Sequence, residues 1–68
     1  MWEYKIYKTD MGWSIYRKKS VGKMIMMQFL NGHDQWTTNK WAAKTFYHRD
    51  DAVWALVVMK QRDEKKSD

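Results

Sequence analysis

The sequence contains no cysteine and no proline among its 68 residues, and only three glycines. Without cysteine the chain forms neither a disulfide nor a cysteine-ligated zinc or iron–sulfur site. Small secreted domains usually depend on disulfides, so their absence predicts a reducing compartment. The glycines, Gly12, Gly22 and Gly32, each stand alone, and this spacing excludes a glycine-rich phosphate-binding loop.

Long hydrophobic runs are also missing. The longest strongly hydrophobic stretch without a charge is Met24–Leu30, far shorter than the roughly 20 residues that a membrane-spanning helix needs. The N-terminus carries a charge at every second or third position and has no apolar core, which argues against a secretory signal peptide. We therefore expect a cytoplasmic protein with no membrane partner.

What the chain does contain is aromatic, apolar and basic. Hydrophobic residues make up 44% of the sequence and aromatic residues 16%, with five tryptophans, four tyrosines and six methionines. This composition is typical of folded chains, and the length suits one domain. We expect a single α+β domain over residues 1–60. Residues 61–68 have no apolar side chain to bury, so we expect a charged tail there that is frayed or disordered.

Alternating apolar residues predict three antiparallel strands. The first covers residues 2–7, and a turn at residues 9–12 leads into a second strand that starts at Trp13. Residues 20–22 interrupt the pattern, and Met24–Leu30 follows as the third strand. Between residues 35 and 47 the pattern favours a short strand, then a helical turn, then extended chain.

The last element is an amphipathic helix. Asp50 or Asp51 is a suitable N-terminal cap, and a carboxylate there complements the helix dipole. From that point apolar residues recur at helical spacing, at Ala52, Val53, Ala55, Leu56 and Met59. Together these elements predict an α+β fold, a three- to four-stranded antiparallel sheet with one C-terminal helix packed on one face.

The titratable residues do not form a recognisable catalytic or metal-binding pattern. His33 and Asp34 follow the Asn-Gly turn, where polar residues simply contact solvent, and His48 precedes the helix. Neither histidine has a recognised ligand spacing to a carboxylate. We expect no enzymatic activity, no metal, no cofactor and no small-molecule substrate.

The positive charge is concentrated in the first half of the chain. Residues 1–30 contain six basic and two acidic residues, whereas residues 31–68 contain seven basic and six acidic ones. The segment 17–23 predicts a loop that projects four cations, Arg17, Lys18, Lys19 and Lys23. Such clusters contact phosphates, and exposed aromatic side chains stack on bases. With Trp13 and Tyr16 as stacking candidates, nucleic-acid binding is one hypothesis, and an acidic protein surface is attracted by the same cations.

Two further features favour a protein partner. On the helix, Trp54 and Val58 fall outside the apolar arc and are predicted to be exposed, as in an interface. On the third strand, Ile25, Met27 and Phe29 share the face expected to enter the core. The opposite face carries Met24, Met26 and Leu30 and needs a second cover. Either a partner or the folded-over segment 36–41 supplies it.

The chain also resembles small phage and prophage accessory proteins in its pattern of residues. The pattern combines an N-terminal hairpin with a WT pair, an AKxF motif and a helix that opens with alanine after acidic residues. In this sequence it is carried by Tyr4–Tyr7, Gly12–Tyr16, Trp36-Thr37, Ala43-Lys44, Phe46 and Ala52. The motif encodes packing, with Trp36 and Phe46 filling the sheet where the helix lands. The resemblance implies a protein that binds host or defence machinery in the host cytoplasm, and it implies no catalytic residues.

The sequence therefore predicts a small non-enzymatic protein-binding module that acts by occluding its target. Trp54, Val58, Met24 and Met26 are the predicted apolar contact residues, and Arg17, Lys18, Lys19 and Lys23 are the predicted electrostatic ones. The partner is a host or defence protein, or a second copy of the chain in a homodimer. Nucleic-acid binding through the basic loop with Trp13 and Tyr16 stays open as the alternative.

Overall fold

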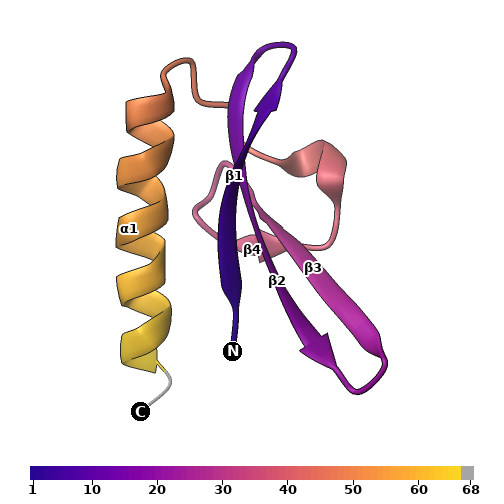
Figure 1. The fold of residues 1–68 in the computed structure, drawn as a ribbon. Coiled ribbons are helices and arrows are strands. Elements are labelled where there is room, and N and C mark those ends of the chain that lie inside the picture. Colours follow the sequence, from indigo (N-terminus) through magenta and orange to yellow (C-terminus); the bar gives the residue numbers. More distant parts are fainter. Residues whose placement is uncertain (67–68) are drawn as a thin grey trace.

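The computed structural model describes residues 1–66 and shows a four-stranded antiparallel sheet with one C-terminal helix (Figure 1). This arrangement confirms the predicted α+β fold. The strands lie in the order β1-β2-β3-β4, and the helix packs against β1 and β2. No helix in the part of the chain that the structure describes is long and apolar enough to span a membrane. The elements are β1 (Glu3–Thr9), β2 (Gly12–Val21), β3 (Met24–Leu30), β4 (Trp36–Thr37), the 3-10 helix η1 (Lys40–Ala42) and α1 (Arg49–Lys66).

Two tight turns join the first three strands. Asp10 and Met11 form the two-residue loop between β1 and β2, since Thr9 pairs with Gly12. The loop between β2 and β3 is equally short, with Gly22 at its first central position. Gly22 has a φ of 62°, which suits the first central position of a two-residue hairpin turn that only glycine adopts easily. The β2–β3 register is unbroken along six residue pairs.

The core lies between the sheet and α1. Ile15 on β2 and Leu30 on β3 are fully buried, and they contact Ala52 and Met59 of the helix. Half-buried apolar side chains surround this cluster: Ile6, Trp13, Trp36, Phe46, Ala55 and Leu56. Because cross-strand partners share a face, these contacts assign the odd-numbered residues of β2 and the even-numbered residues of β1 and β3 to the helix side. Trp36 and Phe46 pack where the helix lands, as predicted.

Residues 43–46 connect the start of β2 to the end of β3. Trp13 and Phe46 exchange two backbone hydrogen bonds, of 2.8 and 2.7 Å. The amide of Lys44 donates to the carbonyl of Leu30 at 2.8 Å, and the Ser14 hydroxyl donates to the Lys44 carbonyl at 2.9 Å. Ser14 is thus a buried polar residue whose hydroxyl is hydrogen-bonded, as buried polar groups require. The short strand at Trp36 and the helical turn at η1 are also as predicted.

Three local expectations need correction. Strand β2 continues to Val21, so residues 17–21 of the predicted loop are part of a strand and only Gly22 and Lys23 form a turn. The helix begins at Arg49, which places Asp50 and Asp51 in its first turn, where they still complement the dipole. On β3, Leu30 belongs to the helix-facing core and is 1% exposed. The face with Met24, Met26 and Leu30 is therefore the helix side, and not the side that needed a second cover.

The C-terminal segment is helical over the described residues. We expected the domain to end at residue 60 and a charged tail to follow, but α1 runs to Lys66. Arg62 and Asp63 are half buried, because this part of the helix lies beside β1 and β2 (Figure 1). The final part of the predicted tail, residues 67–68, lies outside the described residues.

Candidate functional site

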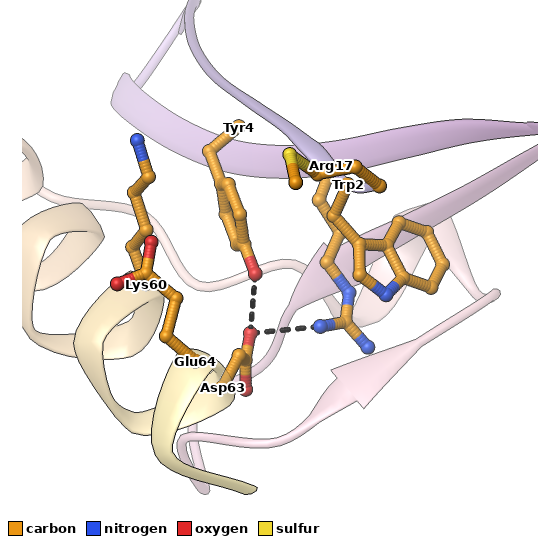
Figure 2. A pocket seen from close by; sticks show the side chains of 7 residues that line it. Trp2, Tyr4, Arg17, Lys60, Asp63 and Glu64 are labelled. Carbon is orange, nitrogen blue, oxygen red and sulfur yellow. Dashed lines mark hydrogen bonds and ion pairs between the residues drawn. The ribbon is translucent and has the colours of Figure 1, made fainter. Parts of the chain in front are cut away.

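The most densely hydrogen-bonded cluster lies where the end of α1 meets the sheet. A single oxygen of Asp63, Oδ2, accepts hydrogen bonds from three side chains of the sheet. The donors are the Tyr4 hydroxyl at 2.8 Å, Nη1 of Arg17 at 2.7 Å and Nε1 of Trp36 at 3.1 Å. Figure 2 shows the Tyr4 and Arg17 side chains pointing toward this carboxylate from the sheet. The acidic residue thus connects the helix to three strands.

Arg17 is held on every side by this cluster. Its Nε and Nη2 both donate to Oε1 of Gln28, at 2.9 and 2.6 Å. The guanidinium lies over the ring of Trp2 at 4.0 Å and over that of Trp36 at 4.4 Å, within the range of favourable cation–π contact. Its side chain is 13% exposed. Arg17 therefore does not project from a basic loop, and its assignment to an accessible basic patch was wrong.

Tyr4 is affected electrostatically by the same cluster. Its burial raises the pKa of the phenol above the ordinary value of 10.0, and the hydrogen bond to Asp63 raises it further. Arg17 acts in the opposite direction, with a smaller effect. A raised pKa keeps the phenol protonated, which is the form that donates to a carboxylate. The cluster has the properties of a structural contact between helix and sheet.

A shallow pocket opens beside this cluster (Figure 2). Lys60 and Glu64 of α1 stand at one side of it and Trp2 at the other. The polar groups at its base, on Tyr4, Arg17 and Asp63, hydrogen-bond to one another. These three polar groups are therefore already engaged with one another.

The other predicted cations lie on different faces of the sheet. Lys18 points away from the helix, with its Nζ 4.0 Å from Oε2 of Glu3. Lys19 lies on the helix side, where its Nζ is 4.5 Å from the centre of the Trp2 ring. Lys23 is exposed in the turn between β2 and β3. The structure thus brings three lysines to one hairpin, but it does not gather them with Arg17 into one loop.

The two predicted stacking residues are also separated. Trp13 lies on the helix side, with the Lys8 ammonium 5.2 Å and the Arg49 guanidinium 5.9 Å from the centre of its ring. Tyr16 lies on the opposite face and contacts the rings of Tyr7 and Phe29. Residues at odd and even positions of one strand point to opposite sides. Trp13 and Tyr16 therefore do not form one stacking surface.

The free end of the β2–β3 hairpin carries a group of exposed apolar side chains. Figure 1 shows both strands extending beyond β4 and away from α1. We call residues 18–27 the hairpin arm. Its apolar side chains are between 43% and 75% exposed, which is unusual for methionine and isoleucine in so small a domain. They are Val21, Met24, Ile25, Met26 and Met27.

The sequence identified only part of this surface. Met24 and Met26 were predicted as contact residues, and both are exposed. Ile25 and Met27 were assigned to the core, yet they are 65% and 43% exposed. The signal that could have found them is the apolar character of both faces of β3, since no element of a short chain covers both sides of a protruding strand. The segment 36–41 was one candidate cover for Met24 and Met26, but both side chains are exposed.

A second exposed apolar group lies on the outer side of α1. Trp54 is 70% exposed, and Val57 and Val58 are exposed next to it along the helix. The exposure of Trp54 and Val58 agrees with the sequence pattern, and Val57 is exposed with them. This group lies on α1, whereas the arm is the free end of the β2–β3 hairpin and extends away from that helix, so the two groups form separate surfaces (Figure 1).

The histidines lie apart from these features. His33 and His48 are exposed, at the turn after β3 and just before α1. Across the residues that the structure describes, no group of three or more histidine, cysteine or acidic side chains is placed to hold a metal ion. Comparison of the chain with protein-family models, with curated proteins and with solved structures found no match.

Proposed function

We propose that this chain is a non-enzymatic protein-binding module and that the hairpin arm makes its principal contact. The observation that carries the proposal is the exposure of five apolar side chains on one projecting hairpin. Methionine is flexible and polarisable, and it is frequent at surfaces that adapt to a partner. Burying such side chains is favourable by about 25 cal/mol for each Å² of apolar area removed from water.

The charge on the arm favours association with an acidic partner. Lys18, Lys19 and Lys23 flank the apolar residues, and no acidic residue lies between Asp10 and Asp34. Cations at the rim of an apolar contact increase the association rate and select against basic partners. The arm thus combines an apolar contact with an electrostatic bias. The resemblance to phage accessory proteins supplies the expected partner class, a host or defence protein whose own contacts are occluded.

Trp54 and Val58 form a second surface in this proposal. An exposed tryptophan beside two valines on one helix is typical of the aromatic anchors found at interfaces. Because this surface is separate from the arm, the two are tested independently. A homodimer through α1 and a partner on the arm are compatible with each other in this geometry.

Nucleic-acid binding is the less favoured alternative. Arg17 is engaged by Asp63 and Gln28, and Trp13 and Tyr16 point to opposite sides. Phosphate contact would therefore depend on the three lysines of the arm without an adjacent stacking pair. Binding of that kind weakens steeply with salt, whereas an apolar protein contact does not.

Site-specific photocrosslinking in host lysate tests the proposal. A benzoylphenylalanine is placed at position 26 on the arm, at position 54 on the helix, or at Lys5 on β1 as a matched exposed control. We expect a protein adduct from position 26 that survives nuclease treatment and does not form from position 5. The unlabelled chain should compete for the partner and reduce the position-26 adduct. An unlabelled chain with Met24→Thr and Ile25→Thr should no longer compete, although its urea midpoint should be unchanged. Adducts that vanish with nuclease, or that form equally at position 5, would contradict the proposal.

A further inference from the structure

The outer edge of β3 is open along most of its length. On one side β3 pairs with β2 from Met24 to Phe29. On the other side β4 pairs with Phe29 and Leu30 alone. In the part of the chain that the structure describes, residues 24–28 therefore have no strand on their outer side. Their backbone groups on that side form a row that a further strand can pair with.

This edge lacks the devices that normally prevent such pairing. The opposite edge of the sheet, β1, carries the exposed charges of Glu3, Lys5 and Lys8, which is how natural edge strands avoid other chains. Residues 24–28 contain no charge and no proline, and the pairing with β2 is unbroken, so no bulge twists the edge away. A regular, uncharged and apolar edge is a site for strand addition.

The side chains on this edge specify the chemistry of the added strand. Met24 and Met26 lie on one face and Ile25 and Met27 on the other, so an added strand meets apolar neighbours on both sides. Next to them on β2, Lys18 pairs with Met27 and Lys19 pairs with Met26. A strand added to β3 lies two strand spacings from β2, about 10 Å, which is close to the Debye length of about 8–10 Å at physiological salt. Carboxylates on that strand are attracted by these lysines.

The same charges select the occupant. A second copy of the chain, added edge to edge, brings three lysines of like charge toward the three already present. An acidic segment instead brings charge that is complementary to the lysines of the arm, so its binding is favoured over that of a second copy. We propose, resting on the proposed protein-binding function, that β3 receives an extended protein segment that carries both apolar and acidic residues, and that this segment pairs with residues 24–28 as a fifth strand of the sheet.

A fluorescein-labelled heptapeptide of alternating glutamate and valine is the probe for this inference. Anisotropy measures its binding to the intact chain, and amide hydrogen exchange locates the contact. We expect saturable binding with new protection at the amides of residues 24–28 and none along β1. The same peptide with every backbone amide N-methylated keeps its side chains and charge but cannot donate hydrogen bonds, so it should bind at least about tenfold more weakly.

Charge is tested on both molecules. Replacing every glutamate of the peptide by lysine should abolish binding, and Lys18→Gln with Lys19→Gln should weaken binding of the acidic peptide roughly two- to tenfold. Lys40→Gln with Lys60→Gln is the matched control, because it removes the same charge away from the arm, and it should weaken binding less. Equal losses in the two variants would overturn the electrostatic part of the inference.

The outcomes separate this inference from the function on which it rests. If the N-methylated peptide bound as tightly as the unmodified one, the contact with the arm would not involve strand pairing. If position 26 formed a protein adduct but the peptide did not bind, strand addition would be refuted while the proposed protein-binding function would stand. Concentration-dependent protection of residues 24–28 without peptide would assign the edge to a second copy and overturn it. Protection by phosphatidylserine vesicles in place of the peptide would assign the edge to a lipid surface, with the same consequence.

Discussion

The Asp63 carboxylate accepts a hydrogen bond from Nη1 of Arg17 at 2.7 Å although 46 positions separate the two residues in the sequence. Their side chains are 15% and 13% exposed, so the ion pair is largely shielded from solvent. It joins the last turns of α1 to the middle of β2. This contact explains why Arg17, alone among the cations at residues 17–23, belongs to the fold rather than to an accessible surface.

Removal of the Asp63 charge is expected to destabilise the whole domain. Asp63→Asn keeps the shape of the side chain but leaves the half-buried Arg17 without its counter-charge. We expect a loss of about 2 to 3 kcal/mol in the free energy of unfolding, measured by urea denaturation. In a double-mutant cycle with Arg17→Met the coupling energy should exceed about 1 kcal/mol.

The Glu3–Lys18 pair provides the control for that cycle. Its atoms are 4.0 Å apart and its side chains are 64% and 38% exposed, so solvent screens the interaction. A cycle of Glu3→Gln and Lys18→Met should give a coupling energy below about 0.5 kcal/mol. Equal coupling in the two cycles would contradict the role assigned to Asp63.

Alkaline pH is expected to weaken the fold through Tyr4. Burial and the Asp63 hydrogen bond raise the pKa of its phenol in the folded chain, whereas in the unfolded chain it titrates near about 10. Between those two pKa values the unfolded chain has lost a proton that the folded chain still holds, so stability is intact below pH 10 and falls as the pH rises beyond it. Tyr4→Phe should remove this part of the decline in urea midpoints, and Tyr47→Phe, at an exposed position, should not.

The two ends of β3 are expected to respond oppositely to truncation. Leu30 and Met24 lie on the same face of the same strand, but they are 1% and 75% exposed. Leu30→Ala opens a cavity in the core and should cost about 2 to 5 kcal/mol. Met24→Ala should change stability by less than about 0.5 kcal/mol. Similar losses at both positions would show that the arm is packed against other parts of the protein.

Gly12 is expected to tolerate no side chain. Its φ is 147°, and a Cβ at this position would collide with the backbone carbonyl of Phe46. Gly12→Ala should therefore cost at least about 1 to 3 kcal/mol, because it strains the backbone and displaces the Trp13–Phe46 pairing. Gly32→Ala is the control, since nothing lies within 4 Å of its added Cβ. Thermal denaturation of both variants decides whether this close approach is essential.

Much of the fold was predictable because it depends on local patterns. The strand at Met24–Leu30 and the hairpin turn at residues 9–12 follow from alternation and turn chemistry, and the structure has both. The short strand at Trp36 and the turn at η1 were also predictable from the types of residue present. The exposure of Trp54 followed from helical periodicity alone.

The remaining features depend on contacts that sequence periodicity does not encode. Arg17 and Lys18 look alike in a charge count, and only the packing of α1 on β2 makes one a buried partner of Asp63. The extent of β2 was underestimated because lysines 18 and 19 resemble a solvated loop, although they lie in a strand that β3 pairs with. For β3, both faces are apolar, and the wrong one was predicted as the helix-facing side because that choice depends on where α1 packs.

The Asp63 cluster also bears on the order in which the chain folds. Its hydrogen bonds span 59, 46 and 27 residues in the sequence, whereas the β1–β2 and β2–β3 hairpins close over two-residue turns. Contacts between distant positions carry the larger loop-closure entropy and form later. We expect the three-stranded meander to form first and the end of α1 to dock last, so Asp63→Asn should accelerate unfolding and leave the refolding rate nearly unchanged.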